Sequence, residues 1–266
     1  MSTIDRTVSR WTVLRAVEHR LLIQKKWFKS ILLFGIGNPT LYLLSIGLGI
    51  GSLVDANTTG VDGVKYLTFL APALLANAAI QSAMTETMFP AMAGFIWAKT
   101  FFGIRSTPIS GKGIAIGIWL SAILQVTFTT SIYWIILWLF GAMDHAGSWL
   151  SLITAIYGGL AVGAVMLFVA SLIDHDDGFL AIVNRFVMMP MFLFSGTFYP
   201  LTTLPLYVRW IGWASPLWHS TELGRWASYG HSIPGTIALI HIAYLGLWIG
   251  LGLYFARRKF NQRLAK

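Results

Sequence analysis

Only a few residues in this sequence have types and spacings that could do chemistry. The segment Ser110-Gly111-Lys112-Gly113 comes nearest to a nucleotide-binding loop. It lacks the earlier glycine of such a loop, and Gly113 stands where a serine or threonine would bind magnesium. We therefore expect the chain itself to bind no nucleotide or other cofactor.

Two further groups have a chemical and an ordinary interpretation. Ser195-Gly196 and His241 could belong to an intramembrane serine protease, but that motif needs a glycine where Leu193 stands, and His241 fits a packing role. The run Asp174-His175-Asp176-Asp177 could bind a metal, but it can equally end two helices in water, and we assign it that role. The chain has no cysteine, which excludes disulfides, thiolate-bound zinc and iron–sulfur clusters.

The composition places the chain in a membrane. Of its 266 residues, 56% are hydrophobic and 11% are charged, whereas soluble domains carry about 25% charged residues. The formal net charge of +9 would suggest nucleic acid in a soluble protein. Membrane proteins concentrate lysine and arginine in cytoplasmic segments, so we expect no nucleic-acid partner.

Six stretches are long and apolar enough to cross a bilayer, which takes about 20 helical residues each. They run from about Ile31 to Leu53, Tyr66 to Pro90, Ile114 to Phe140, Trp149 to Ile173, Phe179 to Phe198, and Ile233 to Ala256. Six spans put both termini on one side, which holds 16 of the 19 lysines and arginines and is therefore expected to be cytoplasmic. The predicted fold is an all-α polytopic membrane protein.

Residues 1–29 are expected to form a unit of their own, ahead of a six-span domain at 30–266. They predict an amphipathic helix that lies on the membrane, with its basic residues among anionic lipid head groups. The apolar residues that fall broadly on one side of this helix are Val8, Trp11, Leu14, Leu21 and Leu22. The alternative is an ordinary solvated basic tail.

The cytoplasmic loop at about 91–112 is expected to form a short aromatic helix over 94–102, which Arg105-Ser106-Thr107-Pro108 ends because proline disfavours helix in the residue before it. A polar loop would suffice as a connector, so this helix indicates docking on another protein. Glu86 could link the loop to the bundle with Arg185 as its partner. The alternative is a carboxylate that reaches the head groups.

The external segment at about 199–232 is too apolar for a free loop and too broken to span. Its prolines and tryptophans are Pro200, Pro205, Pro216, Trp210, Trp213, Trp218 and Trp226. We expect a pair of short helices that enter the outer leaflet and turn back before the last span. Such backbone must be buried in protein or line a cavity.

Seven short segments carry a resemblance when they are taken together and in order. They are Gly37–Leu43, Tyr66–Pro72, Thr85–Thr87, Pro190–Leu201, Leu204-Pro205, Ser215–Leu217 and His219-Ser220. With them, nearly the whole chain resembles the permeases of type-2 ABC exporters, in the branch of nodulation lipo-oligosaccharide exporters and related antibiotic exporters. The loop at 93–102 is poorer in charge than in the nodulation branch.

The resemblance implies a transporter subunit of the bacterial plasma membrane that is not an enzyme. It implies a pair of permeases, which we expect to be a homodimer, with two cytoplasmic ABC ATPase subunits that hold ATP and magnesium. The residues that we assign to ATPase coupling are Glu86, Phe95, Trp97, Phe101 and Arg105. The residues that we assign to an external cap are Ser195, Gly196, Tyr199, Pro200, Trp210, Trp213 and Trp218.

The substrate and two other classes of protein stay open at this point. A glycolipid, lipo-oligosaccharide or polysaccharide-type substrate leads, followed by an amphipathic drug or antibiotic. A membrane enzyme acting on lipid-linked sugar would need a cluster of acidic or histidine residues at one interface, and only Glu222 and His219 are found outside. The other class is a channel or secondary transporter that needs no ATPase.

The orientation can be tested with single cysteines, because the chain has none of its own. A cysteine at Gln262 should resist a membrane-impermeant thiol reagent in intact cells, and one at Asn57 should react. Both should react after permeabilisation, which controls for access. Labelling at Gln262 but not at Asn57 in intact cells would contradict the topology.

Overall fold

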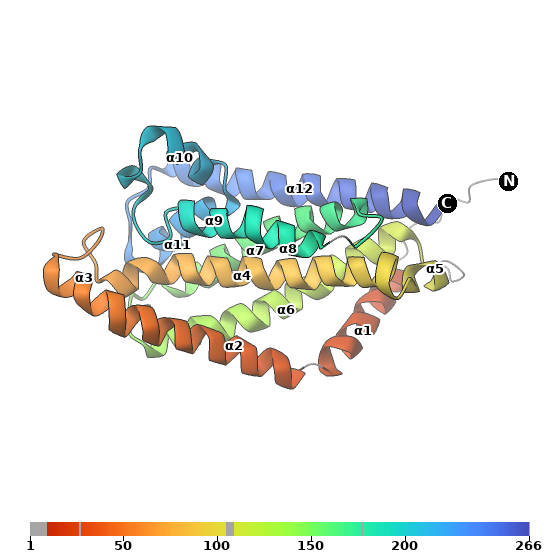
Figure 1. Cartoon of the computed structure of the whole chain (residues 1–266), viewed down its shortest axis with the longest axis horizontal. Coiled ribbons are helices and arrows are strands. Elements are labelled where there is room, and N and C mark those ends of the chain that lie inside the picture. The colour runs from red at the N-terminus through yellow and green to blue at the C-terminus, as the bar shows by residue number, and fades with distance from the viewer. Residues whose placement is uncertain (1–9, 27, 105–108, 177, 266) are drawn as a thin grey trace.

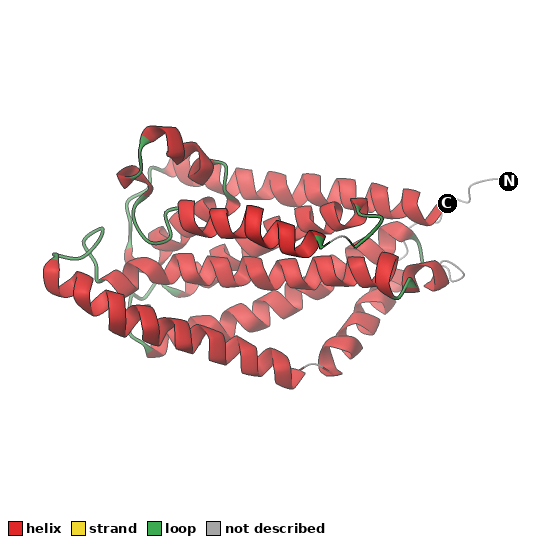
Figure 2. Ribbon diagram, viewed as in Figure 1, coloured by secondary structure: helices red, strands yellow, loops and turns green. Residues whose placement is uncertain are grey.

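The computed structural model describes residues 10–26, 28–104, 109–176 and 178–265 as a bundle of helices (Figures 1 and 2). These residues form no strand, and the only β-type pairing among them is an isolated bridge between Val61 and Val64. The all-α prediction is therefore confirmed. Helices are the expected form for such a chain, because lipid offers no hydrogen bonds to an open backbone.

Five helices of the described chain are long and apolar enough to cross a membrane. Their spans are Thr40–Asn57, Tyr66–Trp97, Gly111–Leu139, Trp149–Leu172 and Gly235–Ala265. The first span is formed by the end of α2 (Phe28–Leu43) with η1 (Leu44–Gly51) and α3 (Ser52–Asn57), and the second by α4 (Tyr66–Met92) with η2 (Ala93–Trp97). The other three spans are α6 (Gly111–Leu139), α7 (Trp149–Leu172) and α12 (Gly235–Ala265). Each corresponds to one of the six stretches expected from the sequence.

The remaining stretch, expected to span from Phe179 to Phe198, is a shorter apolar helix at Phe179–Phe194. It consists of α8 (Phe179–Val183), η3 (Asn184–Met188) and α9 (Met189–Phe194). The helix stops early because Gly196 has φ 72°, a left-handed conformation that ends a helix. At about 1.5 Å per residue this helix is shorter than the hydrocarbon core, so a sixth span stays a prediction.

The centre of the bundle is the contact between α4 and α7, with α6, α11 (Pro216–Tyr229) and α12 packed around it. Glycines let the two central helices approach closely. A Cβ at Gly159 would lie 2.7 Å from the carbonyl oxygen of Ala79, and one at Gly163 would lie 3.1 Å from the Cβ of Ala83. This pair of glycines, four residues apart, therefore serves packing within one chain.

The helix α12 continues for nine residues beyond Ala256, where the apolar stretch expected from the sequence ended. Its last turns stay helical because Phe260 and Leu264 are buried against the bundle. The C-terminal end of α12 lies at the same end of the molecule as α5 (Thr100–Ile104), while α3 and α10 (Leu206–Trp213) lie at the other end (Figure 1).

The helix α1 (Arg10–Lys26) packs along α6, where Ala16 faces Gly117. Its buried residues are Val13 and Gln24, whereas the predicted apolar residues Leu14, Leu21 and Leu22 are exposed. Val8 and the side chain of Trp11 lie outside the described residues. The helix thus has apolar residues on two faces, and its placement at a membrane surface stays a prediction.

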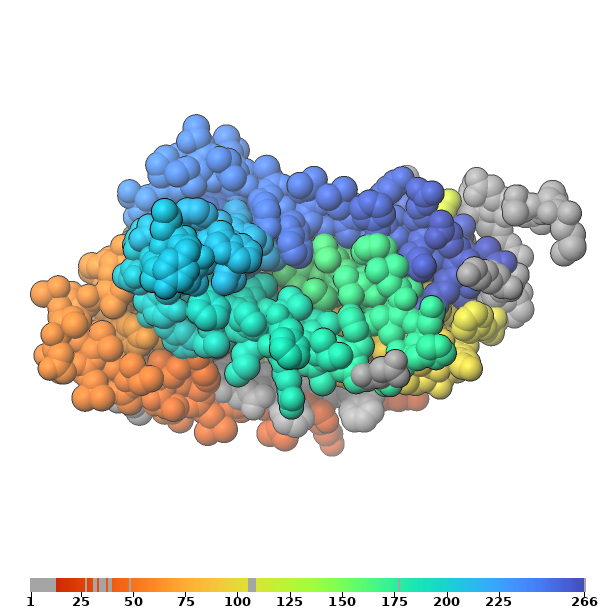
Figure 3. Space-filling model, turned by 45° about the horizontal axis from the view of Figure 1, so that its top comes forward, coloured from red at the N-terminus to blue at the C-terminus, as the bar shows by residue number. Residues whose placement is uncertain are grey.

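The segment 199–232 contains the two short helices that the sequence predicts, α10 and α11, preceded by the turn η4 (Leu201–Thr203). They differ in surroundings: α11 packs against α4, α7 and α12, whereas α10 stands away from the bundle in Figure 1 and lies on the face of the molecule shown in Figure 3. Whether these helices enter a bilayer stays a prediction.

A matched pair of glycine substitutions tests the central contact. Gly159→Ala should lower the free energy of unfolding by about 1–3 kcal/mol, because the new methyl group meets the Ala79 carbonyl. Gly250→Ala should cause no loss, since nothing lies within 4 Å of a Cβ built there. The measurement is the thermal unfolding midpoint of the purified chain in detergent, and equal midpoints for both variants would contradict the packing.

Candidate functional site

The loop that follows the second span forms a tight elbow, which we define as residues 93–104. The chain continues from α4 through the π-helical turn η2, breaks at Lys99 with φ 51°, and resumes as α5. The prediction of a single helix over 94–102 is therefore wrong. The chain folds back because Phe101 packs directly over Gly94, where a side chain would collide with the phenyl ring.

Two of the predicted coupling aromatics lie inside the elbow. Phe95 is 3% exposed and meets Phe101 and Phe260 edge-on, with ring centroids 5.0 Å and 4.8 Å away. The guanidinium of Arg263 lies 4.4 Å from the centre of the Phe95 ring. The expectation that Phe95 and Phe101 form a docking surface thus needs correction, because the chain's own helix α12 covers them. They are placed to hold the elbow in shape.

The exposed aromatics of the elbow are Trp97 and Phe102, which are 45% and 42% exposed. The indole nitrogen of Trp97 donates to Asp176 at 2.8 Å, and Arg263 contacts the neighbouring Asp174 at 3.2 Å. The acidic turn after α7 therefore joins the elbow to α12. The predicted coupling residue Arg105 lies outside the described residues.

Glu86 is the second feature of this end of the bundle. Its carboxylate accepts hydrogen bonds from Gln24 at 2.7 Å and from Arg20 at 3.3 Å, and both partners come from α1. The expected partner Arg185 was wrong, because α1 brings Arg20 and Gln24 to the carboxylate instead. Burial lowers the pKa of Arg20, and Glu86 opposes that shift. The pair fixes α1 to the last part of α4, about two helical turns before the elbow.

At the opposite end, the residues assigned to the cap divide into a buried and an exposed set. The Ser195 hydroxyl donates to Ser215 at 2.6 Å, and the Gly196 carbonyl accepts from Arg225 at 2.7 Å, so both tie the end of α9 to α11. Tyr199 donates a hydrogen bond to the Leu193 carbonyl, and Pro200 directly precedes η4. The exposed set consists of Trp210 and Trp213, whose side chains are 61% and 47% exposed.

A pair of histidines lies behind Trp218. The Nδ1 atoms of His219 and His241 are 2.6 Å apart, and Nε2 of His219 is 2.9 Å from the Trp213 carbonyl. A carbonyl only accepts, so Nε2 of His219 carries the hydrogen and its Nδ1 accepts from His241. Burial lowers the pKa of His219, which favours this neutral form. The packing role predicted for His241 is thus observed, and its partner was not foreseen.

A cluster of charged residues that the sequence analysis missed lies beside the cap. Asp62 is 2.6 Å from His231 and accepts from Tyr229 at 2.9 Å, while Glu222 accepts from the buried Arg225 at 2.9 Å. Asp62 and His231 are far apart in the sequence, so no local pattern joins them. The carboxylates are already engaged by neighbouring side chains, and the described residues contain no group of three ligands suited to a metal.

The other chemical candidates resolve into structural roles. Ser110 caps the start of α6, where its Oγ accepts the Gly113 N–H at 3.1 Å, so the lysine-containing segment is a helix start. Ser195 pairs with another serine and His241 with another histidine. Among the described residues, these two therefore make no serine–histidine pair.

Comparison with known proteins identifies the family of this chain. A family model described as ABC-2 type transporter matches residues 12–229, which is most of the chain. The chain belongs to the ABC-2 type transporter family. It is therefore the membrane subunit of a transporter, a permease and not an enzyme, and membership of the family implies an ABC ATPase subunit as its partner.

Several proteins called nodulation protein J are similar to this permease from end to end. The protein of Rhizobium leguminosarum bv. viciae is 27% identical over 90% of this chain and 91% of its own. Those of Neorhizobium galegae and Sinorhizobium fredii are 26% and 25% identical, over 92% and 96% of this chain and 91% and 94% of their own. The resemblance read from the seven segments is therefore confirmed.

The contact between Glu86 and Arg20 can be tested with a double-mutant cycle on the permease. Glu86→Gln should lower the free energy of unfolding by about 3 kcal/mol, because it leaves a mostly buried guanidinium without its counter-charge. The double variant Arg20→Gln/Glu86→Gln should recover most of this loss. The measurement is thermal or denaturant unfolding of the purified chain.

The control is the exposed pair of Arg15 and Glu18 on the same helix. Glu18→Gln should cost less than about 1 kcal/mol, as exposed ion pairs do. If Glu86→Gln and Glu18→Gln have the same effect, the buried pair does not hold α1 on the bundle.

Proposed function

We propose that this permease is the membrane-spanning subunit of an ATP-driven exporter of an amphipathic substrate across the bacterial plasma membrane. Two copies of the chain form the pathway, and two separate ATPase subunits bind ATP and magnesium. The observation that carries the proposal is the end-to-end similarity to nodulation protein J within the ABC-2 family. The substrate class that we propose, from the resemblance to the branch of lipo-oligosaccharide exporters, is a glycolipid, lipo-oligosaccharide or polysaccharide-type molecule.

The elbow is the surface that we assign to the ATPase. Trp97 and Phe102 extend from it as exposed aromatics, and Lys99 lies between them in a backbone break. An apolar pair at the tip of a rigid elbow suits a groove on a partner, because burying a large aromatic contributes about 1.5–3 kcal/mol. Phe95 and Phe101 act one layer deeper and keep the tip in place.

The contacts of the elbow give a route by which a displacement reaches the spans. The elbow continues directly from α4, contacts α12 through Phe95 and Phe260, and is preceded by Glu86, which binds α1. A displacement of Trp97 and Phe102 by the ATPase would therefore move α1, α4 and α12 together. This is why we keep Glu86 in the coupling set although it is too buried to touch a partner.

At the other end we propose that the segment 199–232 caps the external mouth and that the substrate leaves beside it. The α10 surface carries the exposed Leu206, Tyr207, Trp210 and Trp213. Tryptophan and tyrosine favour the boundary between head groups and water. An amphipathic substrate that leaves the pathway passes this same boundary. The alternative is a static plug that only fills space between the spans.

The other candidate functions differ in their support. Export of an amphipathic drug or antibiotic needs the same fold and contacts, and we place it second because the sequence resembles the branch of lipo-oligosaccharide exporters. A membrane enzyme acting on lipid-linked sugar would need carboxylates that are accessible to the substrate. Asp62 is instead bound by Tyr229 and His231, and Glu222 is bound by Arg225.

The docking proposal is tested by copurification with the ATPase. The double variant Trp97→Ala/Phe102→Ala should weaken association by at least tenfold, because each aromatic lost from the interface costs about 1.5–3 kcal/mol. The thermal midpoint of the purified permease should change little, since both side chains are exposed.

The matched control removes the same aromatic area at the opposite end, in Tyr207→Ala/Trp210→Ala, and should leave association unchanged. Phe95→Ala gives the contrast, with a loss of about 3–5 kcal/mol in folding stability because it empties a buried site. Wild-type association of the Trp97→Ala/Phe102→Ala variant would place the docking surface elsewhere.

A further inference from the structure

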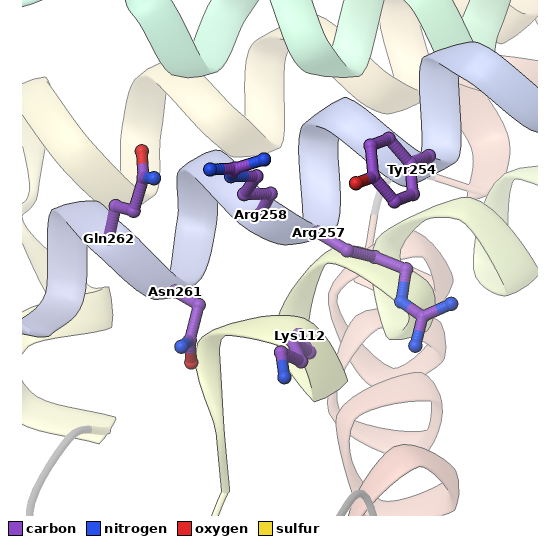
Figure 4. A pocket seen from close by; sticks show the side chains of 6 residues that line it. All are labelled: Lys112, Tyr254, Arg257, Arg258, Asn261 and Gln262. Atoms are coloured by element: carbon purple, nitrogen blue, oxygen red, sulfur yellow. The ribbon is translucent and has the colours of Figure 1, made fainter. Parts of the chain in front are cut away.

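The cytoplasmic end of α12 carries a cavity that the transport proposal does not use. Its volume is about 560 Å³, and it opens to the surface between the last turns of α12 and the first turn of α6 (Figure 4). The residues that line it are Lys112, Tyr254, Arg257, Arg258, Asn261 and Gln262.

The sequence builds one wall of this cavity as a stripe on a single helix. The five lining residues of α12 follow the spacing i, i+3, i+4, i+7 and i+8, which places them on one face. Lys112 comes from α6 and lies beneath α12, on the same side as Arg257 and Asn261 (Figure 4). A Cβ at Gly111 would lie 2.8 Å from the Phe260 backbone, so the two helices touch at this point.

The charge of the cavity has one sign. Three lining residues are cationic, the others offer amide and hydroxyl donors, and none is acidic. Within the part of the chain that the structure describes, neither Arg257 nor Arg258 forms an ion pair with a carboxylate. Arg263, farther along the same helix, is instead bound to Asp174 and Ser171. Arg257 and Arg258 are thus exposed cations without a counter-charge among the described residues.

The surroundings fit the boundary of a membrane. Leu251 lies three residues before the stripe and Phe255 lies directly after its first residue, Tyr254, and both of these apolar side chains are exposed. Apolar side chains beside a basic cavity match a molecule that has acyl chains joined to an anionic group. Basic pockets between helices on the cytoplasmic side suit the phosphate of such lipids.

We propose that this cavity binds the head group of an anionic phospholipid from the cytoplasmic leaflet. The phosphodiester lies between Lys112, Arg257 and Arg258, and the acyl chains run along the apolar surface of α12 toward Leu251. A bound lipid would hold the start of α6 against α12, directly behind the elbow. This site is separate from the exposed tip at Trp97 and Phe102 and needs no ATPase.

The test is native mass spectrometry of the purified full-length permease, titrated with phosphatidylglycerol and, separately, with phosphatidylcholine of the same acyl chains. The permease should bind phosphatidylglycerol more tightly. Arg257→Gln/Arg258→Gln should weaken that binding by about 30-fold, because each cation near a lipid surface contributes about 1 kcal/mol. Affinity should also fall as salt is added.

The control variant Lys29→Gln/Arg185→Gln removes the same charge from exposed positions outside the cavity, and should leave phosphatidylglycerol binding unchanged. Equal weakening by both variants would show diffuse charge attraction and overturn the site. Displacement of the lipid by an excess of inorganic phosphate would show that the cavity is a site for free anions and would contradict the proposal that it binds a phospholipid. Because no ATPase is present, either failure leaves the transport proposal intact.

Discussion

The buried contact between Glu86 and α1 determines how one end of this permease is organised. A carboxylate inside a membrane protein is costly unless it is paired, and here Arg20 and Gln24 supply that partner. The pairing holds α1 across the end of α4, and the elbow follows within two helical turns. The aromatic contact of Phe95 with Phe260 then fixes the elbow to α12. The helices α1, α4 and α12 consequently meet at the elbow, which is the surface that we propose for docking.

The other end of the molecule follows from a different constraint. We predict that the segment 199–232 enters the outer leaflet, where backbone that does not span must be covered by protein because lipid offers it no hydrogen bonds. The helix α11 meets this demand by packing among α4, α7 and α12, while α10 keeps its tryptophans outside. Arg225 of α11 joins this helix to the end of α9, since it donates to Glu222 on its own helix and to the carbonyl of Gly196, which follows α9. The cap is therefore part of the bundle and not an appended loop.

The sequence predicted the features that depend on neighbouring residues. Apolar runs placed five of the six spans, and prolines with tryptophans marked the two short helices of 199–232. The sequence could not supply contacts between distant segments, and this is where Arg185 was wrongly assigned to Glu86 and Asp62 was missed beside His231. The same limit explains Phe95 and Phe101, whose aromatic character indicated a surface until α12 was seen to cover them.

Proteoliposomes that contain this permease with its ATPase subunit provide the most direct test of the account. The quantity to measure is the movement of a fluorescent glycolipid across the bilayer, with and without ATP. The account predicts movement only when the permease, the ATPase and ATP are all present, and none with the permease alone. Equal movement by the permease without ATPase or ATP would contradict it and would make the chain a channel or a secondary transporter.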